Sequence, residues 1–422
     1  MYFKTLFFLL FLTFLSSVVR LKAQINSNNI DRNFLDQNQL YIHPSASNKI
    51  LLNTTYEIEM ASNALTNSFM KAALFKGFID EKEKNDVSKH LSQRNTLGLE
   101  TNFAIHALFR KPKYAVIAGI GHRELLYTKF SSGLFETIFR GNKMYTGQNV
   151  ELGNTNIGYL NYDYLYIGLN KSIKNFNIYS SIQLIRGGFW LNSNIEKAKM
   201  YTEVDGSYIN FDSRLTLNYS PNKFSTFPST SGLGSAINLG INWTKNQHKI
   251  NFEIRDLGFI YWKNQSKFSL DSNYKYEGIE ANDLFDQNVF ASNNIEIDTI
   301  AQKIKVPKNT ENITQFIPST IIANYNFQLN PKTELFLGVK QILLSSYLPK
   351  ITLRAQFQIL KSLYVLPSIN YGGFGKQSLE IGLIKSFNKT LIASCNLYII
   401  EYLLFNKNTL GSGLNFSLTK SF

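Results

Sequence analysis

The sequence predicts an all-β fold: an antiparallel transmembrane β-barrel of about 14 strands (range about 14–16), with an N-terminal plug segment and a few short helices. Three observations carry this prediction. The chain begins with a segment typical of export, it contains no later apolar run near the ~18 residues of a membrane helix, and many segments alternate apolar and polar residues. Such alternation gives each strand one apolar face, as a lipid-facing barrel wall requires.

The first 23 residues resemble a secretory signal. Lys4 precedes an apolar run from Leu6 to Leu15, and a small residue, Ala23, offers a cleavage site. An uncleaved anchor helix is the alternative, but the apolar run is short for a membrane span. The only cysteine, Cys395, lies far from this junction and excludes both a lipid-anchored cysteine there and a disulfide within the chain.

The segment 24–49 shows no alternation and is rich in Asn, Asp and Gln. Irregular backbone cannot face lipid, so we expect this segment in the periplasm or inside the barrel as a plug. A proline near its end removes a backbone donor and predicts a bend before the first strand. Its candidate plug or ligand-gate residues are Asp31, Arg32, Asp36, His43 and Pro44.

The barrel is expected over 50–422. Ile50 to Met60 is the first alternating strand, and 80–91 has apolar residues at helical spacing. A hairpin follows, with strands at 97–109 and 114–127. Alternation then breaks at 131–140, where Ser131 and Ser132 are candidate helix caps.

The aromatic residues of this second helix have two interpretations. Phe135 and Phe139 are candidates for a ligand gate, while packing of the helix on the barrel rim or interior is the simpler explanation.

Later strands are separated by alternately short and long connections, as periplasmic turns and extracellular loops are. We expect Gly187-Gly188 to form a bulge or bend, and the longest break, 262–312, to be an extracellular loop or a lumenal constriction. The C-terminal third contains three clear hairpins, with turns near Pro331, Lys361 and Asn388.

The last strand, Leu410 to Phe422, ends the chain on an aromatic residue. Alternate residues from Leu410 to Phe422 form an apolar face, with Lys420 as the exception, and we expect Ile50 to Met60 to be the pairing partner that closes the barrel. A terminal aromatic at the membrane interface predicts a role in assembly for Phe422.

The aromatic content of 14% suits interfacial girdles, and the formal charge of +14 is spread among turns and loops. No clustered basic face or recognition motif indicates nucleic-acid binding. We expect outer-membrane lipid and lipopolysaccharide as surroundings and the barrel-assembly machinery as a folding partner.

Five short motifs follow one another along nearly the whole chain. They are His43-Pro44-Ser45-Ala46, Leu134 to Phe139 with Gly141-Asn142 and Tyr145-Thr146-Gly147, Arg186-Gly187-Gly188-Phe189, Arg255-Asp256-Leu257-Gly258-Phe259-Ile260 with Trp262, and Ile317-Pro318 with Tyr325. In this order they resemble an uncharacterised Bacteroidota outer-membrane β-barrel family, a domain of unknown function, which is itself distantly similar to long-chain fatty-acid transporter (FadL-like) barrels. The resemblance implies about 14 strands and passage of a hydrophobic ligand. One departure is His43, which stands where the transporters have Asn.

The sequence gives little support for a catalytic site. The five histidines occur singly, and the best pair, His106 and His122, falls on adjacent predicted strands. We therefore expect no enzyme activity, no cofactor and no metal.

Two functions remain open for an expected location in the outer membrane of a Gram-negative bacterium. The favoured one is a passive or gated channel or transporter for a hydrophobic or small ligand. The alternative is a non-transporting scaffold or partner-binding barrel of a secretion or cell-surface assembly. A ligand path predicts an apolar or gapped channel, whereas a scaffold predicts a sealed interior.

Overall fold

The computed structural model describes residues 50–111, 114–220, 231–276, 309–388, 390–398 and 409–422. The expected signal at 1–23 and the plug segment at 24–49 lie outside these residues. Five of the candidate site residues are therefore not placed, namely Asp31, Arg32, Asp36, His43 and Pro44.

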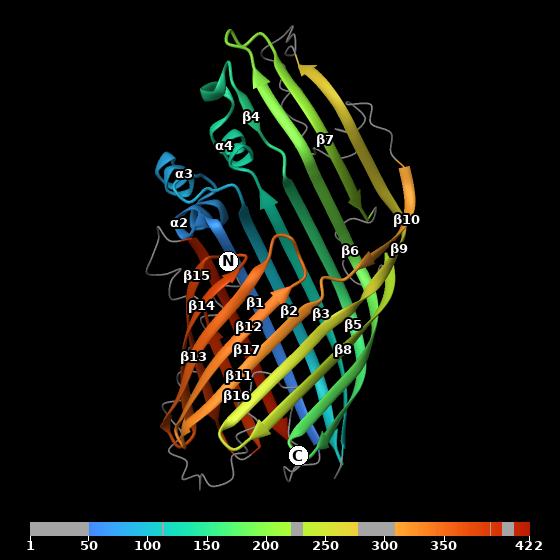
Figure 1. Ribbon diagram of the computed structural model, residues 1–422, viewed down its shortest axis with the longest axis vertical. Helices are drawn as coiled ribbons and strands as arrows, with labels where there is room; N and C mark the ends of the chain where they lie inside the picture. Colours follow the sequence, from blue (N-terminus) through green and yellow to red (C-terminus); the bar gives the residue numbers. More distant parts are fainter. Residues whose placement is uncertain (1–49, 112–113, 221–230, 277–308, 389, 399–408) are drawn as a thin grey trace.

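Fourteen antiparallel strands form a closed ring, which confirms the predicted barrel (Figure 1). Consecutive members of the ring are hydrogen-bonded neighbours, and the last pairs with the first. They are β1 (Ile50–Thr66), β2 (Asn95–Arg110), β3 (Tyr114–Phe130), β5 (Thr155–Ile173), β6 (Phe176–Thr202), β8 (Gly232–Lys245), β9 (His248–Tyr276), β11 (Thr320–Asn330), β12 (Thr333–Ile342), β13 (Leu348–Leu360), β14 (Leu363–Gly373), β15 (Gln377–Ser386), β16 (Leu391–Leu397) and β17 (Thr409–Ser421).

The first and last strands close the ring in a single register. Leu51 pairs with Ser421, and the register continues unbroken to Ala61 opposite Gly411. At the lower end in Figure 1 the Phe422 amide donates to the Ile50 carbonyl at 2.9 Å. The predicted partnership of the two terminal strands is therefore confirmed.

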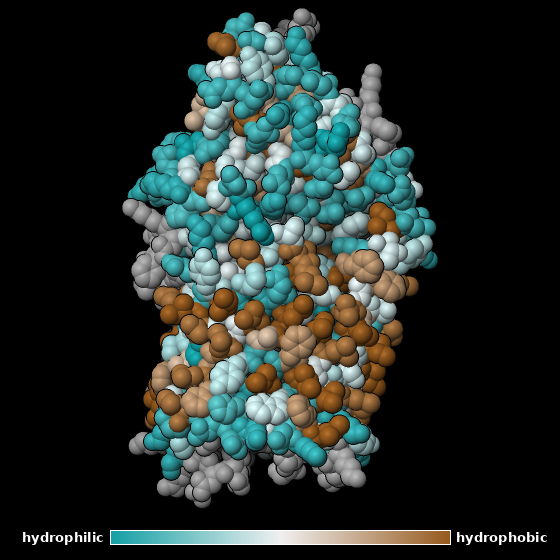
Figure 2. Space-filling model, in the orientation of Figure 1, coloured by the Kyte–Doolittle hydropathy of each residue, from teal (hydrophilic) through white to brown (hydrophobic). Residues whose placement is uncertain are grey.

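On the face shown in Figure 2, an apolar belt crosses the lower half of the barrel between polar zones above and below it. On β5 the outward side chains of Leu165, Ile167 and Leu169 are more than half exposed, while their inward neighbours Tyr166 and Asn170 are buried. The predicted alternation thus places apolar groups toward lipid and polar groups toward the lumen. Among the described residues, no helix is long and apolar enough to span a membrane.

Two strands extend far beyond the belt. β6 and β9 have 27 and 29 residues, whereas a barrel strand needs only ~9–11 residues to cross the hydrocarbon. Their upper parts pair with β7 (Ile209–Tyr219), and β4 (Asn149–Glu151) and β10 (Asn309–Phe316) add to the same extension (Figure 1).

This extension corrects the predicted 262–312 loop. Residues 262–276 continue β9, and 309–312 belong to β10, so only 277–308 lies outside the described strands. The alternation there is weak because neither face of the extension meets lipid, and polar residues are therefore tolerated on both faces.

The predicted bend at Gly187-Gly188 is a bulge. Asn161 on β5 pairs with Phe189 and the next residue, Tyr162, pairs with Gly187, which leaves Gly188 as the extra residue. A bulge of this kind increases the local twist, here at the level where β6 leaves the barrel wall.

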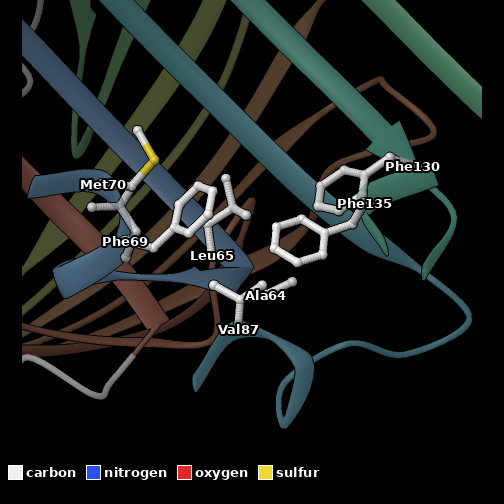
Figure 3. Packing of buried hydrophobic residues seen from close by; sticks show 8 residues of the cluster. Ala64, Leu65, Phe69, Met70, Val87, Phe130 and Phe135 are labelled. Carbon is white, nitrogen blue, oxygen red and sulfur yellow. The ribbon is translucent and has the colours of Figure 1, made fainter. Parts of the chain in front are cut away.

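Short helices cover the upper rim beside the extension. Two were predicted: α3 (Glu81–Ser88) and α4 (Ser132–Arg140), the latter capped by the Ser131 hydroxyl, which accepts from the Leu134 amide at 3.2 Å. The others are α2 (Asn67–Lys71), a π-helical turn (Ala72–Lys76) and a 3-10 turn (Lys143–Tyr145). Figure 3 shows how apolar side chains from β1, α2, α3, β3 and α4 meet in one cluster.

Cysteine cross-linking tests the closure register. In a Cys395→Ser background, Ile58→Cys with Leu414→Cys should form a disulfide, because these two residues are directly paired on the outer face. Ile58→Cys with Asn415→Cys should not, since residue 415 faces the lumen. Gel migration with and without reductant measures the link, and equal yields from both pairs would contradict this register.

Candidate lumenal site

The lumen contains a cavity of about 270 Å³ in the middle of the barrel. Its lining comes from strands on opposite sides of the ring. Most of the lining residues are polar or charged, and Tyr166, Tyr179, Ile384 and Ile392 of two apolar clusters also take part. The polar lining residues used below are Glu57, Glu100, Asn102, His106, Arg123, Tyr164, Gln183, Asn238, Asp256 and Lys340.

A chain of ion pairs crosses this cavity. Arg123 of β3 contacts the Asp256 carboxylate of β9, and its guanidinium also lies 3.9 Å from Glu100 of β2. Lys340 of β12 reaches the same Glu100 carboxylate at 2.8 Å. Because β3 and β9 are separated in the ring by β5, β6 and β8, these contacts join opposite walls.

A bulge in β9 directs Asp256 into the lumen. The pairing with β8 shifts between Ile237 and Leu239, and Asp256 has φ +58, in the left-handed region that Asp tolerates better than most residues. The Asp256 amide donates to Asn238 Oδ1 at 2.8 Å, and Gln183 Nε2 donates to its carboxylate at 3.2 Å. The backbone and side chain of Asp256 are thus both anchored.

Some polar atoms around this cavity lack partners. His106 Nε2 and Gln183 Oε1 are buried and accept or donate no hydrogen bond within the described part of the chain. Both residues are less than one-tenth exposed. A buried polar atom without a partner is costly, so the cavity is suited to water or to a polar solute.

A second, smaller cavity of about 150 Å³ adjoins the first. The two share Glu57, Ile322, Lys340 and Asn415 in their linings. The second is lined by cationic groups from β9, β12 and β13 and by a few acids, the charged members being Glu57, Glu59, Lys249, Lys340, Lys350 and Arg354.

Two loops fold inward at the upper mouth and form a lid, defined here as 343–347 and 374–376. Phe374 lies against Gly98 of β2, so closely that a Cβ on Gly98 would come 2.0 Å from its ring. The Thr96 hydroxyl donates to the Phe374 carbonyl at 2.7 Å, and the Tyr347 ring packs edge-on against Phe374 at 4.9 Å. Since β14 and β2 are not neighbours in the ring, the lid reaches across the mouth.

The lid loop after β14 turns on two glycines. Gly372 and Gly373 have φ +101 and +73, which residues with a side chain rarely adopt. A Cβ at Gly372 would also come 2.1 Å from the Pro349 carbonyl oxygen. This turn places Phe374 over the lumen.

The sequence-predicted aromatic gate residues lie elsewhere. Phe135 and Phe139 pack with Phe69 at centroid distances of 4.8 to 5.5 Å in the rim cluster of Figure 3, and neither lines the two cavities. A gating role for them stays a prediction.

The histidine pair expected on adjacent strands does not meet. His106 faces the lumen, whereas His122 faces outward and contacts Asp163 at 2.8 Å. His106 pairs with Gly119, and His122 lies three residues along β3 from Gly119. Because an odd offset along a strand reverses the direction of the side chain, the two histidines face opposite sides of the wall. Within the described residues, no cluster of three or more His, Cys, Asp or Glu could hold a metal ion.

A charged contact also orders the rim helices. Burial raises the pKa of Glu83, but hydrogen bonds from Lys76 Nζ at 3.1 Å and from the Asp80 amide at 2.8 Å outweigh it and leave the pKa below its usual value. The stabilisation of α3 by this carboxylate is therefore present at neutral pH and is lost as pH falls through the lowered pKa.

A model of a family of unknown function, DUF5723, matches residues 50–400. The chain belongs to this family. The expected resemblance to an uncharacterised barrel family is thereby confirmed. No curated protein matches the chain.

Three solved structures are similar over most of their length and share the barrel fold. They are the toluene transporter TodX of Pseudomonas putida (9% identity, 90% of this chain, 91% of that chain, TM-score 0.45), the toluene transporter TbuX of Ralstonia pickettii (8%, 90%, 91%, 0.43) and a FadL homologue of Pseudomonas aeruginosa (9%, 90%, 91%, 0.41). Likeness this weak does not bear on what the DUF5723 chain binds.

Loss of the Asp256 carboxylate tests the importance of the cross-lumen pair. Asp256→Asn should lower the free energy of unfolding by about 3 kcal/mol, because Arg123 stays buried without its partner. Asp271→Asn is the matched control, since its pair with Arg214 is more than half exposed, and it should cost less than about 1 kcal/mol. Urea unfolding followed by tryptophan fluorescence measures both, and equal losses would contradict a structural role for the buried pair.

Proposed function

We propose that this DUF5723 protein is a gated channel for small polar solutes in the outer membrane of a Gram-negative bacterium. The observation that carries the proposal is the lumen itself. It retains two adjoining cavities lined by polar groups, some without hydrogen-bond partners among the described residues, beneath a lid that crosses the mouth. A barrel interior serving only stability would be expected to fill this space and pair these groups.

The lining favours a polar solute over the hydrophobic ligand considered from the sequence. An apolar molecule in the middle of the lumen would displace water from Glu100, Arg123 and Asp256 without replacing its hydrogen bonds. A solute with its own donors and acceptors can satisfy groups such as His106 Nε2.

In the proposed channel, the lid acts as the gate. Phe374 and Tyr347 are each 4% exposed and belong to one apolar cluster with Ala61, Leu125, Tyr127 and Ile342. Phe374 also lies against Gly98, and its carbonyl accepts from the Thr96 hydroxyl. Releasing Phe374 from these contacts would uncover the mouth without breaking a pair of barrel strands.

The exterior supports the expected surroundings. The apolar belt suits outer-membrane lipid, and the polar zone above it suits lipopolysaccharide head groups (Figure 2). Phe422 is 60% exposed beyond the lower end of β17, which supports a contact of this residue with the barrel-assembly machinery.

The extension favours the alternative function, a scaffold that binds another protein. β6, β7 and β9 form a sheet that projects well beyond the belt, more than a channel mouth needs (Figure 1). A scaffold would bind its partner there with no change of permeability. The two functions are thus separable by measuring ion current.

Opening the lid tests the channel. Phe374→Ala should raise single-channel conductance in planar bilayers several-fold, because the ring that covers the mouth is removed. Gly98→Ala should act in the same direction, since its Cβ would displace the Phe374 ring. Phe316→Ala is the control, because that side chain is 78% exposed on the extension. Inserted variants with unchanged low conductance would contradict the gate.

The terminal residue is expected to act in assembly alone. Phe422→Ser should reduce the fraction of protein inserted into the outer membrane, while each inserted barrel should keep the wild-type conductance. Heat-modifiable gel migration measures insertion. Normal insertion, or an altered conductance, would contradict the assignment.

A further inference from the structure

We propose that the second lumenal cavity is an anion subsite that binds the carboxylate or phosphate group of the passing solute. The inference rests on the proposed channel function and names the class of solute. It is argued from Arg354, from Asn251 and from the ion pairs of the other lining cations.

Arg354 is a buried cation without a carboxylate partner. It lies on β13, is 9% exposed, and lines the cavity. Its guanidinium stacks over the Phe336 ring at 4.1 Å, and no carboxylate of the described residues is within ion-pair distance. A buried charge is normally paired with an opposite charge. An anion bound at this guanidinium would supply that missing partner.

Asn251 provides a second, independent observation. It lies on β9, separated from β13 in the ring by β11 and β12, lines the same cavity and is 6% exposed. Neither its amide nitrogen nor its amide oxygen has a hydrogen-bond partner among the described residues. The nitrogen can donate to an oxyanion, as the guanidinium of Arg354 can, so both unsatisfied groups are suited to one ligand.

The other lining cations are paired. Lys350 contacts Glu59, Lys340 contacts Glu100, and Lys249 lies 3.6 Å from Glu334. Among the described residues, Arg354 is thus the lining cation that has no ion pair, and the site for an anion is set by its position and not by a net charge of the lining.

Two acids oppose the anion from farther away. Glu57 lies in the part of the lining shared with the first cavity, and Glu380 interacts with Arg354 only electrostatically. Neither carboxylate reaches ion-pair distance of the guanidinium among the described contacts. An oxyanion between Arg354 and Asn251 would meet both unsatisfied groups, and guanidinium geometry favours carboxylate and phosphate.

The test measures ion selectivity of the full chain in planar bilayers, with Phe374→Ala added to open the lid. The reversal potential in a KCl gradient should show preference for chloride over potassium, and inorganic phosphate or acetate should reduce the chloride current. Arg354→Gln should lower the selectivity ratio about fivefold and remove the block. Arg354→Lys should retain selectivity, and Arg214→Gln on the exposed extension is the control.

The outcomes separate the two proposals. Current that is unselective and insensitive to both oxyanions would overturn the subsite and leave the channel standing. Absence of current in every inserted variant would overturn the channel function. Thermal unfolding with phosphate or acetate then decides the subsite: stabilisation of wild type but not Arg354→Gln supports it, and no stabilisation overturns it. The more effective oxyanion in either assay identifies phosphate or carboxylate as the preferred group.

Discussion

The whole structure depends on satisfying backbone hydrogen bonds where there is no water. In hydrocarbon an open sheet edge would leave a row of N–H and C=O groups unpaired, so the sheet must close. Closure requires the two ends of the chain to meet, and β1 and β17 do so in an unbroken register from Leu51–Ser421 to Ala61–Gly411. Once that register is set, alternation decides for every residue of the wall whether it meets lipid or the lumen.

This constraint explains which features were predictable. The strands, the two capped helices and the partnership of 50–60 with 410–422 all follow from local patterns that lipid and backbone geometry enforce. The long break was predicted too wide because residues 266–276 pair with β7, and above the belt no apolar surroundings impose an apolar face on the strand. Alternation of apolar and polar residues identifies a strand only where the two faces of that strand meet different surroundings.

The lumenal site was not predictable in the same way. Arg123, Asp256 and Lys340 are scattered over more than two hundred residues of sequence, and they meet only because the ring brings opposite walls together. Asp256 lay within a motif singled out beforehand, but its inward direction depends on a bulge and a left-handed backbone that period-two alternation does not reveal. Phe374 likewise acquires its role from a distant glycine, Gly98.

The lumen is therefore where this fold leaves freedom for function. Outward positions must satisfy lipid and backbone positions must satisfy their neighbours, so their chemistry is dictated by folding. Inward charges face no such demand, and paired charges such as Lys350 with Glu59 would suffice to fill the interior. Arg354 departs from that arrangement, because its guanidinium stacks on Phe336 but has no carboxylate within ion-pair distance among the described residues. A buried cation without an anion, in the same cavity as the unsatisfied amide of Asn251, is best explained by a ligand that both groups can bind.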